Sequence, residues 1–366
     1  MEQANETHGG DSRPVRNIAR GGQTSGDASA RQVITDLSSS VWAFSALACA
    51  LEAGLLEALS EARRLADLGE RSGIPACLVE GLLDVLVSLG LLLRAGDGYS
   101  STPDLLPLLQ APARDALLAD IRSVYLQSRA IIDAAKKRTL LAGWSHTDPE
   151  LLAAQGTSSG SLFHTLASTL FPRLDGLIER LQSPTGTFLD IGTGVGAIAI
   201  QMCRLFPRLH VVGLEPQDAP LAEARRNVAA AKLGEHIELR AQRIEDLADR
   251  EAFDLVWLPQ VFLPREVLER GLRRAWAALR PGGWILLIAF STPGMDLDAA
   301  LLRLANVAYG GDPLYPEQVA ELLADADFAR TQVFPSPAGS IPKLIVGQRP
   351  LFHIAIYYEN VPSASR

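Results

Sequence analysis

The stretch FLDIGTGVG, residues 188–196, decides the fold of this 366-residue chain. A short apolar run ends at Ile191, three glycines alternate with other residues, and an apolar helical pattern starts at Ala197. Glycine lets the backbone turn tightly and approach a ligand without a Cβ clash. This order predicts a strand, a ligand-binding turn and a helix that begins at the turn.

The sequence beyond this stretch alternates between apolar strands and amphipathic helices. Strands are expected at 211–214, 237–239, 253–258 and 284–290, and near 329–334 and 342–347; helices are expected at 197–206, 219–232 and 267–279. This alternation is typical of a parallel, doubly wound sheet. The turn Pro281-Gly282-Gly283 precedes an unbroken apolar run, which predicts a strand buried on both faces.

Two carboxylates indicate the ligand. Asp190 precedes the first glycine, where a negative charge repels a pyrophosphate but suits a cationic group. The glycine spacing is Gly-x-Gly-x-Gly, not the Gly-x-Gly-x-x-Gly of dinucleotide-binding folds. Glu215 ends the second strand, 215 − 196 = 19 positions after Gly196, where such folds place the acceptor for ribose hydroxyls. One carboxylate suited to a sulfonium and an amino group, together with a second that accepts ribose hydroxyls, describes a site for S-adenosylmethionine.

The region 31–115 has the order helix, helix, helix, hairpin, which is that of a winged helix. Helices are expected over 41–59 and 78–89, and the turn 95–98 joins two short strands. The helix in the recognition position, near 76–88, carries Glu80 and Asp84 and no Lys or Arg. A DNA reader needs basic side chains there. The apolar excess of these helices instead predicts a dimer interface.

Composition excludes several classes of protein. The chain has 34 Lys plus Arg and 42 Asp plus Glu, a net charge of −8, which disfavours nucleic-acid binding. Cys49, Cys77 and Cys203 are too scattered for a disulfide framework or a zinc site. The first thirty residues are polar and predict a disordered tail. The apolar stretch 41–59 is interrupted by two glutamates, so no membrane span is expected, and the protein is expected in the cytoplasm.

The segment 116–183 predicts helices with two breaks, at 143–149 and at 155–160. Thr147 or Asp148 is expected to cap the helix that Pro149 opens.

Four motifs carry a resemblance to a known family: FLDIGTGVG at 188–196, VVGLEP at 211–216, FDLVWL at 253–258 and LRPGGWILL at 279–287. On these motifs, residues 184–347 resemble a class I S-adenosylmethionine-dependent methyltransferase domain. With the N-terminal module, the chain is similar to the small-molecule O-methyltransferase family, in which a dimerising winged-helix domain precedes this catalytic domain.

The resemblance implies a Rossmann-like α/β domain with a mostly parallel seven-stranded sheet, preceded by a mostly α-helical winged-helix domain. The implied divisions are a disordered tail at 1–30, the dimerisation domain at 31–115, a helical linker and acceptor-covering segment at 116–183, the catalytic domain at 184–347 and a C-terminal tail at 348–366. It also implies S-adenosyl-L-methionine as cofactor, S-adenosyl-L-homocysteine as product, no metal, a small-molecule acceptor and a homodimer.

The family's cofactor residues carry over to matching positions. The three glycines would line the methionine and ribose, Asp190 would orient the loop or reach the amino group through water, and Glu215 would accept both ribose hydroxyls. The full cofactor-binding set is Asp190, Gly192, Thr193, Gly194, Gly196, Glu215, Pro216, Gln242, Arg243, Ile244 and Pro259. One departure is Gln242-Arg243 where the family has Gly-Asp, because arginine cannot accept the adenine amino group's hydrogen bond.

The second departure concerns the general base. The family places a histidine nine positions after the Asp that begins the fourth strand, and 254 + 9 = 263, which is Leu. The chain's histidines are His8, His146, His164, His210, His236 and His353. His164 and His146 lie in the acceptor-covering segment and are the candidate bases, although a half-buried helix histidine is an ordinary alternative for His164. Candidate acceptor-binding residues are Trp144, Phe163, Phe262 and Tyr309, for which a core role is the alternative.

These features predict a methyltransferase of secondary metabolism that O-methylates a small aromatic or natural-product intermediate. N- or C-methylation of a small metabolite is the nearest alternative, and an already nucleophilic acceptor needs no base. A S-adenosylmethionine-binding enzyme that transfers no methyl group, and a winged-helix regulator that senses the cofactor, are the others. The acidic recognition helix disfavours the regulator.

Overall fold

The computed structural model describes residues 29–111, 113–139, 144, 146–335 and 343–351. They form two compact units. The first unit takes in the described residues of 1–139, 148–161 and 294–302, and the second those of 140–147, 162–293 and 303–366. Most of the expected N-terminal and C-terminal tails, with His8 and His353, lies outside the described residues.

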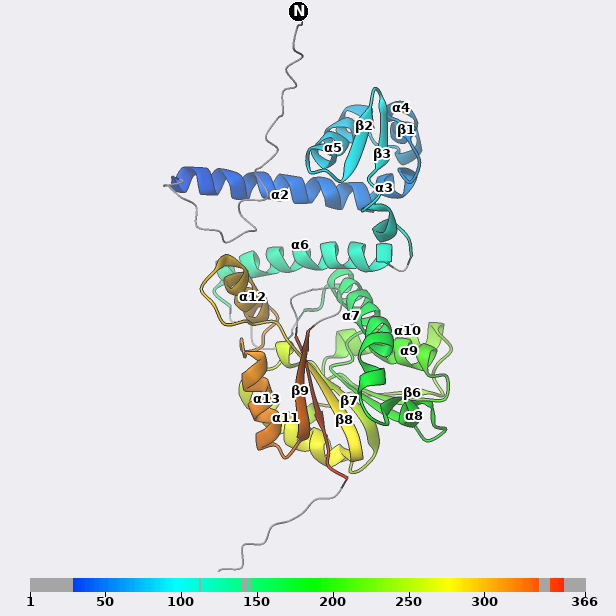
Figure 1. The fold of residues 1–366 in the computed structure, drawn as a ribbon, viewed down its shortest axis with the longest axis vertical. Helices are drawn as coiled ribbons and strands as arrows, with labels where there is room; N and C mark the ends of the chain where they lie inside the picture. Colours follow the sequence, from blue (N-terminus) through cyan, green and yellow to red (C-terminus); the bar gives the residue numbers. More distant parts are fainter. Residues whose placement is uncertain (1–28, 112, 140–143, 145, 336–342, 352–366) are drawn as a thin grey trace, which may run out of the picture. The chain divides into compact units, whose positions relative to one another are not determined.

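The N-terminal half of the first unit contains the expected helices and hairpin (Figure 1). Its elements are α2 (Ala30–Glu52), α3 (Leu55–Ala58), β1 (Arg63–Arg64), α4 (Leu65–Ser72), α5 (Ala76–Ser88), β2 (Leu92–Ala95), β3 (Gly98–Ser101), η1 (Leu106–Leu109) and α6 (Ala113–Lys137). The strands form a sheet in the order β1-β3-β2, and Ala95 pairs with Gly98 across the turn. The expected helix over 41–59 is in fact two helices: α2 starts earlier, at Ala30, and ends at Glu52, and α3 follows from Leu55.

The outer face of α2 is apolar. Ile34, Val41 and Trp42 are 64%, 65% and 78% exposed. This helix is the one candidate membrane span among the described residues, by length and composition alone, and it also lies near the N-terminus. The same length and apolar face suit a helix that packs against another protein chain.

The acidic helix α5 does not present a basic surface. Arg94 on β2 bonds to both of its carboxylates, with 2.6 Å to Asp84 Oδ1 and 3.1 Å to Glu80 Oε1. The Tyr99 hydroxyl donates to the same Asp84 oxygen at 2.8 Å. The arginine nearest this helix is therefore engaged within the unit.

The second unit is built on a seven-stranded sheet in the order β6-β5-β4-β7-β8-β10-β9. Its strands are β4 (Thr187–Ile191), β5 (His210–Leu214), β6 (Ile237–Arg240), β7 (Phe253–Leu258), β8 (Leu279–Ala289), β9 (Ala329–Pro335) and β10 (Lys343–Gln348). The first five are parallel, and β10 runs antiparallel to both of its neighbours. The mostly parallel sheet and Rossmann-like fold are therefore confirmed.

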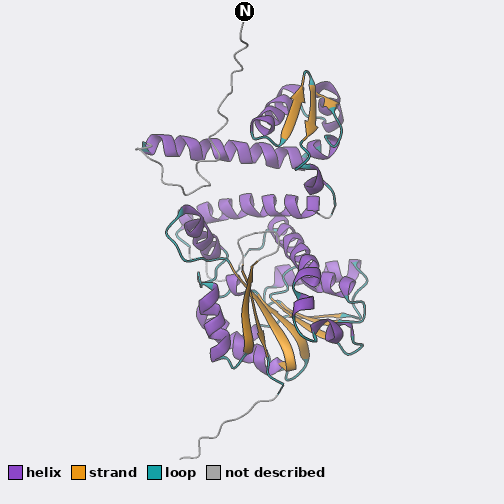
Figure 2. Ribbon diagram, viewed as in Figure 1, coloured by secondary structure: helices purple, strands orange, loops and turns teal. Residues whose placement is uncertain are grey.

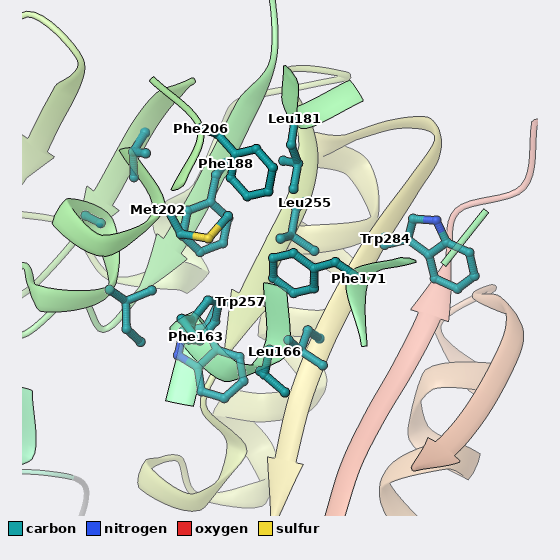
Figure 3. Packing of buried hydrophobic residues seen from close by; sticks show 14 of the residues in the cluster. Phe163, Leu166, Phe171, Leu181, Phe188, Met202, Phe206, Leu255, Trp257 and Trp284 are labelled. Carbon is teal, nitrogen blue, oxygen red and sulfur yellow. The ribbon is translucent and has the colours of Figure 1, made fainter. Parts of the chain in front are cut away.

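Helices cover both faces of this sheet (Figure 2). The helical elements are α7 (Pro149–Thr169), which is shared between the two units, η2 (Phe171–Arg173), α8 (Leu177–Gln182), α9 (Ala197–Leu205), α10 (Asp218–Ala230), η3 (Ile244–Asp246), η4 (Gln260–Phe262), α11 (Arg265–Ala278), α12 (Leu297–Ala308), also shared, and α13 (Pro316–Asp325). Two apolar clusters fill the layers. One contains Phe163, Phe188 and Trp257 (Figure 3), and the other lies against α11 and α13.

Two local predictions were wrong. Residues 155–160, expected as a loop, lie within α7. A tertiary contact offsets the weak helix propensity of Gly, Ser and Thr there, since Ser158 Oγ donates to the Asp120 carboxylate on α6. The expected turn at 281–283 lies within β8, where the register with β7 shifts between Phe253 and Leu255. Of the two candidate caps, Asp148 accepts from the Glu150 and Leu151 amides.

Candidate active site

The glycine loop connects β4 to α9 in left-handed turns. Gly192, Gly194 and Gly196 have φ of +67°, +56° and +80°, a region that residues with a Cβ rarely adopt. Gly196 also brings α10 close, because a Cβ there would lie 3.4 Å from that of Ala224. The three glycines therefore form a left-handed loop between β4 and α9 at the carboxyl end of the sheet, which confirms the expected order of strand, turn and helix.

Asp190 lies beneath this loop, completely buried. Thr193 Oγ1 donates to its Oδ2 at 2.6 Å, and its Oδ1 has no hydrogen-bond partner among the residues that the structure describes. Burial raises the pKa of Asp190 to about 7, against the opposing effects of the Thr193 hydroxyl and the Ala199 backbone amide, and the nearby Glu215 charge adds to the rise. Gly213 makes room for Thr193, since a Cβ at 213 would lie 2.9 Å from the threonine side chain.

Glu215 follows β5 and fastens the loop to that strand. Its two oxygens accept from the Gly194 amide at 3.1 Å and from the Gln217 amide at 2.9 Å. Burial raises the pKa of Glu215 as well, and these two amide bonds oppose the rise. Neither Asp190 nor Glu215 forms an ion pair with Lys or Arg within the part of the chain that the structure describes. Two buried carboxylates without a cation make a site suited to a cationic ligand.

The other expected cofactor residues divide into two groups. Pro259 is buried beside the loop, with Cγ 3.6 Å from the place of a Gly192 Cβ, and Pro216 is exposed directly after Glu215. Gln242 uses its amide N–H on the Asp246 carbonyl, and Arg243 is exposed. Ile244 is buried in the core, 3.2 Å from the place of a Gly271 Cβ. The loop, both carboxylates and Pro259 are thus brought together, whereas Ile244 packs into the core.

An aromatic cluster forms at the same end of the sheet, made of Trp144, Phe262 and Tyr309. Ring centroids are 4.9 Å apart for Trp144–Phe262, 5.8 Å for Trp144–Tyr309 and 5.3 Å for Phe262–Tyr309. Gln217 Nε2 donates to the Trp144 carbonyl, which links this cluster to the residues after Glu215.

Phe163, expected with the aromatic acceptor residues, lies elsewhere. It is fully buried in the core, 5.1 Å from the Trp257 ring centroid and 6.3 Å from that of Phe171 (Figure 3). Phe163 and Leu166 are three residues apart on α7, so they lie on the same face of the helix, and both pack into the core cluster against the sheet.

The two candidate bases occupy different environments. His146 stands edge-on to Trp144 in the aromatic cluster, with centroids 4.6 Å apart. His164 is exposed, and its Nδ1 lies 3.2 Å from Gln201 Nε2 on the second turn of α9. Leu263 ends η4 and packs against the apolar core. Only His146 of these three positions therefore combines an imidazole with the aromatic cluster.

Sequence reasoning missed three buried polar residues at this end of the sheet: Gln260, Ser291 and Asn306. Gln260 and Ser291 follow apolar strands directly, and a polar residue at that point of a parallel sheet is a usable signal. Asn306 lies in an apolar helix pattern that did not distinguish it. Among the described residues there is no group of three or more His, Cys, Asp or Glu that could hold a metal.

Comparison with known proteins identifies two domains. Residues 188–283 match a methyltransferase domain, and residues 35–104 match an O-methyltransferase dimerisation domain. The ubiquinone/menaquinone biosynthesis C-methyltransferase of Geobacter sulfurreducens is 30% identical over 204 residues, which are 47% of this chain and 79% of that protein. The corresponding Geotalea daltonii enzyme is 26% identical over 159 residues, which are 37% of this chain and 66% of that protein, so the match spans about two thirds of its length.

Solved structures agree with the fold. A putative O-methyltransferase from Nostoc punctiforme superimposes with a TM-score of 0.66 at 18% identity, covering 87% of this chain and 99% of that one. The relative from Geobacter and the two domain matches go further, and they show that the chain belongs to the class I S-adenosylmethionine-dependent methyltransferases, with a catalytic domain that follows an O-methyltransferase dimerisation domain.

Proposed function

We propose that this protein transfers a methyl group from S-adenosylmethionine to an oxygen of a small aromatic or natural-product acceptor. The observation that carries the proposal is the pair of buried, unpaired carboxylates at the glycine loop, next to the cluster of Trp144, Phe262 and Tyr309. When bound, S-adenosylmethionine supplies a methyl group on a sulfonium, which an acceptor atom displaces in line.

The residues of the loop fit this cofactor. Asp190 Oδ1 is buried and has no partner within the described part of the chain, so an ammonium or a bridging water would satisfy it. Each Glu215 oxygen accepts one backbone amide and keeps a second lone pair for a ribose hydroxyl. Because the glycines of the loop have no side chains, the cofactor can approach the backbone closely there.

The aromatic cluster would hold the acceptor. Offset and edge-to-face aromatic contacts orient a flat ring, and orientation at near-attack distance supplies much of the acceleration in a displacement that needs little covalent help. His146, edge-on to Trp144, would take the proton of an acceptor hydroxyl. His164 stays the second candidate, although its bond to Gln201 on α9 supports a structural role.

C-methylation is the second candidate function. It is favoured by Leu263 where the family has a histidine, and by relatives that are named C-methyltransferases. The experiment that separates the two uses S-adenosylmethionine with a 13C-labelled methyl group and a set of phenols. An O-methyl product gives a methoxy carbon resonance and a C-methyl product an aryl-methyl resonance, and absence of label in every acceptor would contradict both.

We further propose a cytoplasmic homodimer joined through residues 31–115, with no nucleic-acid or membrane partner. The exposed apolar face of α2 and the acidic face of α5 support it. The domain limits at 30, 115, 183 and 347 belong to the same proposal.

A further inference from the structure

Most of the buried polar side chains described in the second unit lie at the carboxyl end of its parallel strands. Seven polar or charged residues are buried among those described there: Asp190, Thr193, Glu215, Asp254, Gln260, Ser291 and Asn306. Asp254 lies at the start of β7 and pairs with Arg180 and Arg280. Of the rest, three belong to the cofactor loop, and Gln260, Ser291 and Asn306 have no part in the function proposed above.

Gln260 and Asn306 meet at one backbone carbonyl. Gln260 Nε2 donates to the Asp312 carbonyl at 2.9 Å, and Asn306 Nδ2 donates to the same oxygen at 3.2 Å. The Asp312 carboxylate in turn accepts from the Arg265 amide at 2.7 Å, at the start of α11. The two amide side chains are therefore oriented by a fixed turn.

This orientation leaves two oxygens without partners. Because a carbonyl only accepts, the nitrogen of each amide must face Asp312, and the oxygens face elsewhere. Gln260 Oε1 and Asn306 Oδ1 are buried and receive no hydrogen bond from any residue that the structure describes, and the same holds for Ser291 Oγ. Folded proteins leave few buried acceptors unpaired, since each one lowers stability. Two such oxygens on adjoining side chains call for a donor from outside the described residues.

The two amides adjoin the aromatic cluster and the cofactor loop. Gln260 lies between Pro259, which touches the glycine loop, and Phe262 of the cluster. Asn306 lies about one helical turn before Tyr309, and the Tyr309 ring lies 5.4 Å from that of Phe290, the neighbour of Ser291. A donor group that reached these oxygens would belong to a molecule held by the aromatic cluster.

We propose that Gln260 and Asn306 form an acceptor-recognition pair, whose amide oxygens receive an O–H or N–H group of the methyl acceptor. The inference rests on the proposed function and deepens it, since it selects acceptors that carry a hydrogen-bond donor beside an aromatic ring. The pair is neutral and takes no proton, so it positions the acceptor. Because both oxygens are buried, this binding requires the side chains that cover them to move.

The test measures binding, not turnover. The probes are 2-naphthol and 2-methoxynaphthalene, titrated by calorimetry into full-length protein saturated with S-adenosylhomocysteine. Wild type should bind the naphthol about 2- to 12-fold more tightly than its ether, the range for one neutral hydrogen bond. Gln260→Met and Asn306→Leu should each reduce this preference. Gln348→Met is the matched control, because that glutamine donates to the Gly282 carbonyl at the far end of the sheet.

Thermal unfolding separates recognition from structure. Each single variant leaves the other amide on the Asp312 carbonyl and removes an unpaired oxygen, so the unfolding temperature should stay within a few degrees of wild type. A lower unfolding temperature with an unchanged naphthol preference would overturn the proposal and leave a purely structural pair. Wild type without any preference would overturn it too, with bridging water as the missing donor.

Failure of the proposed function has a different signature. A protein that transfers no methyl group but loses its naphthol preference in both variants would contradict methyl transfer and support the recognition pair.

Discussion

At the scale of single residues, the site depends on Asp190 and Glu215, which are buried without a cationic side chain. Burial alone would favour their neutral forms, and the hydrogen bonds from Thr193, Gly194 and Gln217 compensate only in part. A cationic ligand completes the balance of charge, which makes cofactor affinity sensitive to each carboxylate.

Replacing Glu215 by alanine should weaken S-adenosylmethionine binding. Loss of two charge-assisted hydrogen bonds costs about 2–4 kcal/mol, or roughly one and a half to three decades in Kd. Calorimetry measures the change, and Glu238→Ala is the control, because that glutamate is 61% exposed and pairs with Arg240. Equal affinity of Glu215→Ala and wild type would remove this residue from the ribose site.

Cofactor affinity should rise with pH up to about 7. The pKa of Asp190 is raised to about 7 by burial, so below this pH the carboxyl is protonated in the free protein, and binding a cation requires loss of that proton. Kd should therefore fall by up to about tenfold per pH unit below 7 and level off above it. Asp190→Asn should bind S-adenosylmethionine weakly, with a Kd that depends less on pH. If the Kd of wild type were as insensitive to pH between 5.5 and 7 as that of this variant, the role of Asp190 would be contradicted.

His146→Ala should lower turnover by about 10²–10⁴ with little change in cofactor affinity, as for a general base. His164→Ala is its partner variant and should keep most of the activity, because His164 is exposed and bonded to Gln201. The reverse ranking would make His164 the base. Full activity of both variants, with no limb near pH 6–7, would show that an already nucleophilic acceptor needs neither.

At the scale of elements, the end of β5 and the glycine loop fit together only because residue 213 lacks a side chain. A Cβ there would lie 2.9 Å from Thr193 and 3.0 Å from Leu239. Gly213→Ala should displace Thr193 from Asp190, destabilise the protein by about 1–3 kcal/mol and weaken cofactor binding. Gly234→Ala is the control, since nothing lies within 4 Å of its added Cβ. Equal binding by both variants would show that the loop tolerates the shift.

Gly194→Val should abolish cofactor binding and preserve the fold. Gly194 has φ of +56°, and a Cβ there would meet only the Gly192 carbonyl, at 3.9 Å, so valine would be strained by its backbone conformation and would project from the loop. Circular dichroism and calorimetry would check the two halves of this expectation, and measurable binding by the variant would contradict it.

The strands and the cofactor loop could be predicted from sequence because they rest on local signals. Apolar runs mark buried parallel strands, and glycines mark the loop that φ values confirm. The helical conformation of residues 155–160 within α7 could not be predicted, since it is supported by a contact with Asp120, far along the chain. The surroundings of Phe163, Ile244 and Asn306 could not be predicted either, because packing between elements sets them.

At the scale of the whole molecule, assembly follows from the apolar face of α2. Light scattering at micromolar concentration should give twice the 39.3 kDa chain mass. Trp42→Asp should give a single chain, because Trp42 is 78% exposed within that face. Val333→Asp on β9 is the control and should stay dimeric. A mass of one chain for wild type would contradict the dimer.

The proposed methyl transfer is tested most directly by following a labelled methyl group. Wild type and Glu215→Ala are each incubated with deuteromethyl S-adenosylmethionine and a set of hydroxylated aromatic acceptors, and mass spectrometry follows acceptor and cofactor together. Wild type should place one labelled methyl group in an acceptor and release an equal amount of S-adenosylhomocysteine, and both should be strongly reduced in the variant. Tight binding of S-adenosylmethionine by wild type, with no label in any acceptor across the set, would contradict the proposed transfer.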